Sequence, residues 1–199
     1  MNLLIATRNK GKLKEIRNIL NLDASIVKSS LDYPEIPDVI EDKDTLEGNA
    51  IKKACEMANA TGCWALSDDS GLEVEALNGA PGVYSARYAG ENCSYLDNIN
   101  KLLYELDGIE NRRAVFKTVL CLVNLVGEVR TVKGICKGII ALAPTGKEGF
   151  GYDPIFIPDG YNCSFAELTI EEKNKISHRG RALTEAIRQW GFILSKFNK

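Results

Sequence analysis

The sequence predicts an α/β protein with a mixed central β-sheet, flanking helices and two lobes around a substrate cleft. In its first half, short apolar runs alternate with segments of helical spacing, and its middle, from Ala114 to Ala141, is strongly β-prone. Alternation of strands and helices favours parallel pairing, whereas a long hairpin requires antiparallel pairing, so the sheet should be mixed. Because no segment resembles an interdomain linker, we expect residues 1–199 to form a single domain.

Composition limits the classes of function. The chain has 199 residues, of which 45% are hydrophobic and 26% charged, which is typical of a globular protein with a sizeable core. A net charge of -2 argues against the broad basic surface that binds duplex nucleic acid. It does not argue against a small anionic ligand, which needs only a local cluster of donors. No apolar run approaches the roughly 20 residues that span a bilayer, and the N-terminus carries no basic leader. We therefore expect a cytoplasmic protein with neither nucleic acid nor membrane as a partner.

The six cysteines are scattered through the chain without a C-x-x-C pair. This spacing argues against a zinc site and against a disulfide framework, and it predicts reduced thiols. A thiol nucleophile would need a neighbouring histidine, and the chain contains only His178.

The first elements follow from changes in periodicity. Residues 3–6 form an apolar run typical of a strand, residues 7–11 a polar loop, and residues 13–20 have the apolar spacing of a helix. The stretch 25–44 contains two prolines, which predicts a connection with at most one short strand or helical turn.

Residues 44–47, Asp-Thr-Leu-Glu, have the spacing of a capping box and predict a second helix, which should end at Gly62. The strand that follows, residues 64–67, should end at Asp68 and Asp69, and carboxylates at a strand terminus lie where ligands gather in open α/β sheets. The remaining elements expected are a turn-rich loop at 78–82, a helix at 96–106, a hairpin of 115–123 with 129–141, a loop at 144–161, short helical turns at 164–177 and a helix at 183–190.

The loop 7–12, between a strand and a helix, has the features of a phosphate site. Backbone N–H groups at a helix N-terminus attract anions, and Lys10 and Lys12 add positive charge. The loop is not a Walker A sequence, so P-loop chemistry does not follow. The alternative is an ordinary strand-to-helix loop with a solvated basic face.

The turn 67–71, Ser-Asp-Asp-Ser-Gly, predicts a metal site. Adjacent carboxylates at the end of an apolar strand repel each other unless a cation or solvent compensates, and Mg²⁺ takes one or two protein carboxylates plus substrate phosphates. Successive side chains of a strand point to opposite faces, so only one of Asp68 and Asp69 should face the metal. Glu41 could supply a second carboxylate. The alternative is an acidic turn that faces solvent.

Two further segments could bind a ligand. His178 and Arg179 follow Lys173 and Lys175, and their donors could bind a carbonyl-bearing ligand, although a lone histidine is often structural. Residues 149–154, Gly-Phe-Gly-Tyr-Asp-Pro, allow close backbone approach and offer aromatic faces for stacking, but alone they are only a loop.

Taken together, these segments resemble the inosine triphosphate pyrophosphatase family, which hydrolyses inosine, deoxyinosine and xanthosine triphosphates to monophosphate and pyrophosphate. The resemblance runs nearly end to end. It is carried by motifs in the same order at residues 6–12, 68–72, 79–88, 149–154 and 177–180.

The resemblance implies a Mg²⁺-dependent enzyme that acts on a purine nucleoside triphosphate and assembles as a homodimer through its central hairpin region. Asp69 would be the general base and, with Glu41, a metal ligand, while Asp68 supports it. The triphosphate would be held chiefly by Thr7, Asn9 and Lys12, with Lys53. The implied substrate-binding residues are Thr7, Arg8, Asn9, Lys10, Gly11, Lys12, Lys53, Ser70, Phe150, Gly151, Tyr152, Asp153, Lys173, His178 and Arg179. The base would stack near the aromatic loop, and donors near His178 and Arg179 would read its 6-oxo group.

The sequence departs from the family at Arg8, where related sequences often have glycine, and Asp42 or Asp44 could replace Glu41 as the second carboxylate. Other interpretations remain: a pyrophosphatase for modified pyrimidine triphosphates, a non-catalytic nucleotide-binding regulator that needs no metal carboxylate, and, weakest, a nucleic-acid-binding protein.

Overall fold

A computed structural model describes residues 2–21 and 26–197 of the chain. Its α-helices are α1 (Lys10–Leu20), α2 (Leu46–Thr61), α3 (Tyr95–Glu105), α4 (Ile170–Ile176) and α5 (His178–Leu194). Its strands are β1 (Leu3–Ala6), β2 (Val27–Ser29), β3 (Trp64–Val74), β4 (Pro81–Gly82), β5 (Arg113–Val123), β6 (Val129–Ile140) and β7 (Phe156–Pro158). Single 3₁₀ turns occur at η1 (Ser30–Asp32), η2 (Glu75–Leu77), η3 (Ser85–Arg87), η4 (Asp153–Ile155), η5 (Phe165–Glu167) and η6 (Ser195–Phe197).

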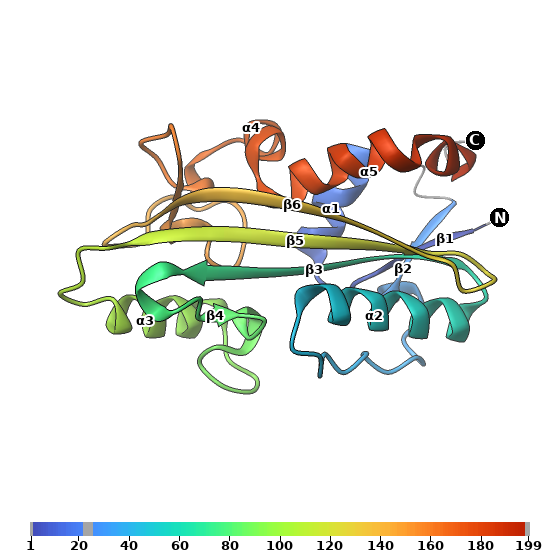
Figure 1. Ribbon diagram of the computed structural model, residues 1–199, viewed down its shortest axis with the longest axis horizontal. Coiled ribbons are helices and arrows are strands. Elements are labelled where there is room, and N and C mark those ends of the chain that lie inside the picture. The colour runs from blue at the N-terminus through green and yellow to red at the C-terminus, as the bar shows by residue number, and fades with distance from the viewer. Residues whose placement is uncertain (1, 22–25, 198–199) are drawn as a thin grey trace. The chain divides into compact units, whose positions relative to one another are not determined.

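The strands form one seven-stranded sheet in the order β2-β1-β3-β5-β6-β7, with β4 paired to β3 (Figure 1). β1 pairs in parallel with both β2 and β3, whereas β4 is antiparallel to β3 and β7 is antiparallel to β6. The sheet is therefore mixed and flanked by helices, which confirms the predicted α/β class.

The chain divides into two compact units, which we describe separately. Unit 1 comprises Met1–Asp69, Thr118–Gly134 and Arg179–Lys199, and unit 2 comprises Ser70–Lys117 and Ile135–His178. The chain passes from one unit to the other within β3, β5 and β6 and at the start of α5. The single domain and the substrate cleft expected from the sequence stay predictions.

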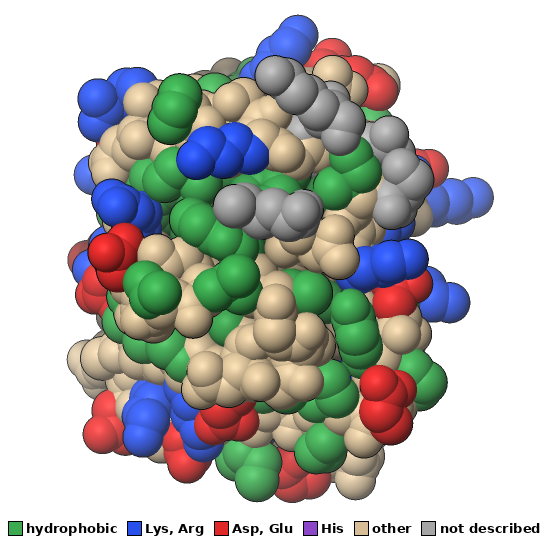
Figure 2. Space-filling view, turned by 90° about the vertical axis from the view of Figure 1, so that its right-hand side faces the viewer, with side chains coloured by type: hydrophobic (Ala, Val, Ile, Leu, Met, Phe, Trp, Pro, Cys, Tyr) green, Lys and Arg blue, Asp and Glu red, His purple; other side chains and the backbone are tan. Residues whose placement is uncertain are grey.

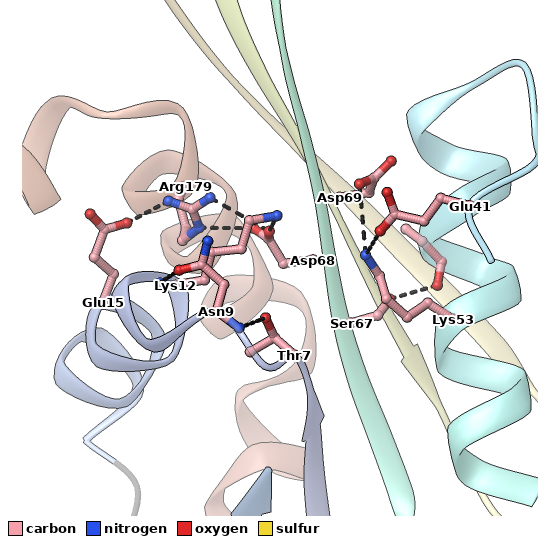
Figure 3. Close-up of polar contacts among 11 residues, drawn as sticks. Thr7, Asn9, Lys12, Glu15, Glu41, Lys53, Ser67, Asp68, Asp69 and Arg179 are labelled. Carbon is pink, nitrogen blue, oxygen red and sulfur yellow. Dashed lines mark hydrogen bonds and ion pairs between the residues drawn. The ribbon is translucent and has the colours of Figure 1, made fainter. Parts of the chain in front are cut away.

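In unit 1, the strands separate two groups of helices. α1 and α5 lie on one side of β3 and α2 lies on the other (Figures 1 and 3). The core contains all of β1 and the apolar faces of α1 and α5, including Ile16, Leu183 and Trp190. Burial of each such side chain contributes about 1.5–3 kcal/mol, so the ends of these elements are held firmly around β3.

The core of unit 2 is rich in aromatic rings. Phe116 lies edge-on to Phe156, with ring centroids 4.7 Å apart, and Phe156 lies 5.0 Å from Phe165. Residues from α3, β5, β6 and the segment after β6 contribute to the same cluster. This core fixes the aromatic loop at 149–154 at its edge, because Tyr152 and Ile155 belong to it.

The prediction that a strand ends at Asp68 and Asp69 is wrong. β3 continues through both aspartates to Val74, because Leu72 and Val74 are buried and the strand pairs with β4, where Leu72 is opposite Gly82. The parallel neighbour β1 does end here, at Ala6 opposite Ser67. The two carboxylates therefore lie just beyond the end of β1 within a continuing strand, and not in a turn.

Other boundaries also differ from the expectations. α1 already begins at Lys10, so part of the predicted polar loop is helical. The connection before α2 contains both a short strand, β2, and a helical turn, η1, and residues 144–161 contain β7 as well as loop. Short strands such as β7 are set by pairing with β6, at Ile139 with Ile157, which periodicity does not reveal.

The surface and the thiols complete this description. Among the described residues, basic side chains on the face in Figure 2 are interspersed with acidic and apolar ones and form no continuous basic patch. Within residues 2–21 and 26–197, the helices are too short or too polar to cross a membrane. The six cysteines are free thiols, three buried (Cys63, Cys121 and Cys136) and three half-buried (Cys55, Cys93 and Cys163).

Candidate functional site

The loop after β1 is shaped by its own side chains. Asn9 is the N-cap of α1 and its Oδ1 accepts a hydrogen bond of 3.1 Å from the Lys12 backbone N–H, while Thr7 Oγ1 accepts one of 3.1 Å from the Asn9 N–H. The first N–H groups of a helix have no partner within it, and the first turn of α1 contains no acidic residue. The exposed Lys10 and the half-buried Gly11 open this turn. The helix dipole and these N–H groups favour an anion at this position.

On the α1 side of β3, Asp68 is completely enclosed by cations. Its carboxylate lies 2.5 Å from Lys12 Nζ and accepts a hydrogen bond of 2.9 Å from Arg179 Nε (Figure 3). Only 1% of the residue is exposed. Burial alone would raise its pKa, but Arg179 and Lys12 outweigh burial and hold the pKa of Asp68 far below its usual range. Asp68 is therefore a permanently ionised structural carboxylate.

Arg179 joins Asp68 to a second buried carboxylate, Glu15 of α1. Arg179 Nη1 donates to Glu15 Oε2 at 2.5 Å, and both residues are almost fully buried. Burial disfavours the charged guanidinium, yet Asp68 and Glu15 together raise the pKa of Arg179. Lys12, Asp68, Arg179 and Glu15 thus form a charge-balanced chain of two cations and two anions, in which each cation faces at least one carboxylate.

Asp69 points to the opposite side of β3, toward α2 (Figure 3). Its Oδ1 lies 3.7 Å from Lys53 Nζ, whereas its Oδ2 is buried and has no hydrogen-bond partner among the described residues. Burial raises the pKa of Asp69 to about 6; Lys53 and Lys12 lower it, and Glu41 and Asp68 raise it. Burial, an unsatisfied oxygen and a pKa near neutrality are frequent properties of catalytic carboxylates.

Lys53 of α2 brings Asp69 and Glu41 to one place. Lys53 Nζ donates to Glu41 Oε1 and also faces Asp69. Burial would lower the pKa of Lys53, but Glu41 and Asp69 outweigh it, so the pKa is raised and the ammonium stays charged. α2 is in turn tied to β3, because Ser67 Oγ donates to the Ala50 carbonyl at 2.6 Å.

Glu41 and Asp69 have the chemistry that a hard divalent cation requires. Both are oxygen donors gathered around a single ammonium, and the buried Oδ2 of Asp69 still lacks a partner among the described residues. Within that part of the chain, no group of three His, Cys, Asp or Glu side chains is placed to hold a metal. Mg²⁺ commonly binds through one or two carboxylates plus substrate phosphates, so this donor set fits that ion.

In unit 2, Asp153 organises the aromatic loop. Its Oδ2 accepts hydrogen bonds of 2.7 Å from the Phe150 backbone N–H and 2.6 Å from Lys173 Nζ, and Lys173 Nζ lies 4.9 Å above the Phe150 ring. Gly149 must be glycine, because its φ is +78° and an added Cβ would lie 2.2 Å from Asp153 Oδ2. These contacts bring Phe150, Asp153 and Lys173 together, and their predicted binding of a nucleotide stays a prediction.

Three other predicted residues of unit 2 have different surroundings. Tyr152 is buried in the core, and its hydroxyl donates to the Ser85 carbonyl at 3.0 Å. Gly151 has a φ of +62° with open space where a Cβ would be. Ser70, the first residue of unit 2, is half-buried within β3. The contacts of Tyr152 therefore fix the loop backbone.

His178 is buried at the start of α5, and its ring stacks on Phe116 with centroids 4.4 Å apart and an interplanar angle of 10°. The neighbouring Arg179 belongs to unit 1, where it contacts Asp68 and Glu15. The two residues were predicted to read a nucleobase together. In the structure, the guanidinium of Arg179 binds Asp68 and Glu15, and the reading of a nucleobase by these two residues stays a prediction.

Sequence reasoning missed Glu15 and Ser85. Glu15 lies between the apolar Leu13 and Ile16 on the buried face of α1, and a carboxylate in that position is the signal that could have revealed a buried cation. Ser85 lies in the motif 79–88 and its Oγ accepts from the Leu72 N–H at 2.9 Å. No local pattern distinguishes Ser85 from an ordinary turn serine.

The chain is similar in sequence to proteins of known name. A "dITP/XTP pyrophosphatase" of Geobacter sulfurreducens is 50% identical over 183 residues, which is 91% of this chain and 92% of that protein. One of Desulfotalea psychrophila is 48% identical, over 92% of this chain and 82% of its own length.

Solved structures are similar as well. The Staphylococcus aureus Ham1 protein superposes with a TM-score of 0.83 at 39% identity, over 98% of this chain and 100% of that one. A HAM1 protein from Coxiella burnetii gives a TM-score of 0.84 at 40% identity, over 98% and 99%. These matches confirm the resemblance drawn from the sequence motifs. A model of the Ham1 family matches residues 3–189, and the chain belongs to that family.

Proposed function

We propose that this protein hydrolyses deaminated purine nucleoside triphosphates, dITP, XTP and ITP, to the monophosphate and pyrophosphate, and so removes them from the nucleotide pool. The names of its relatives give the substrate class. The single structural observation that supports a hydrolytic site is Asp69, a buried carboxylate with one oxygen lacking a partner among the described residues, beside Lys53 and Glu41.

In this proposal Asp69 is the general base. A base near neutrality is ionised at physiological pH and still accepts a proton from water, and the pKa of Asp69 is raised by burial to about 6. Lys53 keeps the carboxylate ionised and orients it. Glu41 and Asp69 would hold Mg²⁺, which supplies neutralisation of phosphate charge and helps to organise the attacking water when bound.

The first turn of α1 would bind the triphosphate. Its backbone N–H groups and Lys12, held by Asp68, present positive charge that is already oriented before substrate arrives. Thr7 and Asn9 fix the loop before α1 through their hydrogen bonds to the backbone N–H groups of Asn9 and Lys12. Pyrophosphate would leave from this cationic position, where the charge that develops on it is stabilised.

The aromatic loop 149–154 and the residues around Lys173 and His178 would bind the nucleoside. Phe150, with Lys173 above its ring, offers a flat surface for the base, and donors near His178 would select a 6-oxo group. Such a pocket offers no partner to a 6-amino group, so ATP should be a poor substrate. Comparable kcat/KM values for ATP and inosine triphosphate would contradict this selectivity.

Product analysis tests the proposed function. Purified protein with Mg²⁺ is incubated with dITP, XTP, ITP, ATP, GTP and a set of modified pyrimidine triphosphates, and pyrophosphate and orthophosphate are measured separately. We expect pyrophosphate from the deaminated purine nucleotides alone. Release of orthophosphate would mean a different bond is cleaved, and turnover of the pyrimidine set alone would change the substrate class.

The proposal also covers the oligomeric state, localisation and partners of the enzyme. We expect a cytoplasmic homodimer that uses the hairpin of β5 and β6 in its contact and that binds neither nucleic acid nor membrane. Sedimentation at two protein concentrations checks the dimer, and retention on single-stranded DNA that falls with salt would contradict the expected absence of nucleic-acid binding.

A further inference from the structure

Arg8 lies in the loop that would bind phosphate, but its guanidinium contacts a different part of unit 1. Nε donates to Asp38 Oδ1 at 2.5 Å, and one terminal nitrogen donates to the carbonyls of Ile36 at 2.6 Å and Tyr33 at 3.3 Å. The three acceptors lie within six residues of one another in the sequence. Through these three hydrogen bonds, the Arg8 side chain binds the segment 33–38.

This segment cannot hold its shape by regular backbone pairing. Residues 33–45 contain neither helix nor strand, and Pro34 and Pro37 have no N–H group to donate. Apart from isolated turn bonds, such as that of 3.2 Å from the Ile36 N–H to the Tyr33 carbonyl, carbonyls in such a stretch need donors from elsewhere. The planar guanidinium of Arg8 supplies donors in several fixed directions at once, which a lysine ammonium on a flexible stem does not.

The same segment leads directly to Glu41. Beyond Asp38 it is tied to α2: Glu41 bonds to Lys53, Asp42 lies 2.9 Å from Lys52, and the Lys43 N–H donates to Asn49 Oδ1 at 2.9 Å. Arg8 holds the first part of the segment and α2 holds the last part. Between the two anchors lies the exposed Ile40, 74% accessible, so packing does little to fix the middle of the segment.

The contacts differ in strength. Asp38 is 79% exposed and the Arg8 side chain 30%, so their ion pair is screened by solvent and contributes little. The bonds to the carbonyls of Ile36 and Tyr33 are partly buried and come from a charged donor, which makes them stronger. The hydrogen bonds from Arg8 to the carbonyls of Ile36 and Tyr33 therefore stabilise the segment more than the ion pair with Asp38 does.

We propose that Arg8 is a positioning residue that fastens the Glu41 segment to the phosphate-binding loop, so that Glu41 stays beside Lys53 and Asp69. The proposal rests on the proposed function for the roles of Glu41 and of the loop 7–12. It also predicts coupling: an anion that orders the loop 7–12 also orders the segment 33–42, since one side chain belongs to both.

Hydrogen–deuterium exchange tests the positioning role without metal or nucleotide. In Arg8→Ala, the hydrogen-bonded amides of Ile36, Asp42 and Lys43 should exchange at least roughly fivefold faster than in the wild type, because local opening becomes easier. Lys14→Ala is the matched control, since it removes an exposed positive charge from α1. Unchanged exchange in Arg8→Ala, or equal acceleration in Lys14→Ala, would overturn the proposal.

Kinetics separate a positioning role from direct phosphate binding. Arg8→Lys keeps the positive charge but loses the planar guanidinium with its several donors, so it should behave like Arg8→Ala. Both variants should require several-fold more Mg²⁺ for half-maximal activity than the wild type. Asp38→Asn should change this Mg²⁺ requirement by about twofold or less. Full rescue by Arg8→Lys would mean that Arg8 acts as a charge on phosphate, against the proposal. If the wild type releases no pyrophosphate but Arg8→Ala still speeds exchange, the proposed function fails and the positioning role stands.

Discussion

Asp68 and Asp69 are neighbours in β3, but their surroundings on the two faces of the strand shift their pKa values in opposite directions. On the α1 and α5 face, Asp68 is paired with Lys12 and Arg179 and is 1% exposed. On the α2 face, Asp69 has Lys53 at 3.7 Å and one buried oxygen that is unpartnered among the described residues. Similar burial therefore gives opposite pKa shifts: far below the usual range for Asp68, and up to about 6 for Asp69.

Under the proposed function, one short motif serves stability through Asp68 and chemistry through Asp69. Alternation along a strand sends adjacent side chains to different environments, so one aspartate can be neutralised completely while the next retains an unsatisfied oxygen. The first binds Lys12 and Arg179 at the start of α5. The second retains the unsatisfied oxygen that its proposed role as a base requires.

The largest expected effect is a loss of activity when Asp69, on the α2 face of β3, is replaced. Asp69→Asn removes the proposed base and should lower kcat by about 10²–10⁴-fold, while the fold is retained. Steady-state pyrophosphate release from dITP measures this. Asp107→Asn, an exposed aspartate after α3, is the matched control. Turnover that survives in Asp69→Asn would remove this residue from the mechanism.

The second effect concerns stability. Asp68→Asn leaves Arg179 and Lys12 without a carboxylate that both share, and breaking a buried pair in this way typically costs about 3–5 kcal/mol. Urea unfolding at pH 7 measures the free energy of unfolding. A loss below about 1 kcal/mol would mean that the enclosed carboxylate is not structural.

The third effect is a pH dependence of opposite sign for the two residues. Asp69 has an ordinary pKa of 3.8 and a folded pKa of about 6, so the folded state binds more protons between these values and Asp69 lowers stability as pH rises through them. Each pKa unit corresponds to about 1.4 kcal/mol, so this contribution is about 3 kcal/mol. Asp68, with a depressed pKa, contributes stability that is lost as pH falls below its ordinary value of 3.8.

Unfolding free energies of the metal-free protein, measured from about pH 4 to pH 7, check the Asp69 contribution. The difference between wild type and Asp69→Asn should move in favour of the variant as pH rises through this range. Parallel curves for the two proteins would show that Asp69 has no raised pKa.

The smallest effect tests Glu15. Glu15→Gln removes one of the two carboxylates that face Arg179 but leaves Asp68 in place, so we expect a loss of about 1–3 kcal/mol. Combined with Asp68→Asn, the loss should differ from the sum of the single effects, because both residues bind one guanidinium. Exact additivity in a double-mutant cycle would separate Glu15 from the network.

The sequence predicted the features that depend on local pattern. The spacing of Leu13, Ile16 and Leu20 predicted α1, and the β-prone stretch predicted β5 and β6. Strand alternation also predicted that Asp68 and Asp69 face opposite sides, which Figure 3 shows. The five motifs predicted the family, which the match of its model to residues 3–189 confirms.

Features that depend on distant contacts were not predictable. β3 continues beyond Asp69 because Leu72 pairs across to Gly82, and nothing near Asp69 in the sequence signals this. Arg179 binds Asp68 and Glu15, which are 111 and 164 residues away. Its position beside His178 suggested a shared role in base binding, which stays a prediction; Arg179 belongs to unit 1 and His178 to unit 2.

The most direct test of the division between the two carboxylates is a carbon NMR titration of the aspartate side chains in the metal-free protein. The account predicts that the Asp69 carboxyl titrates near pH 6 and that the Asp68 carboxyl stays ionised until the protein unfolds in acid. Assignments come from Asp69→Asn and Asp68→Asn. Titration of both carboxyls together near their ordinary pKa of 3.8 would contradict the account.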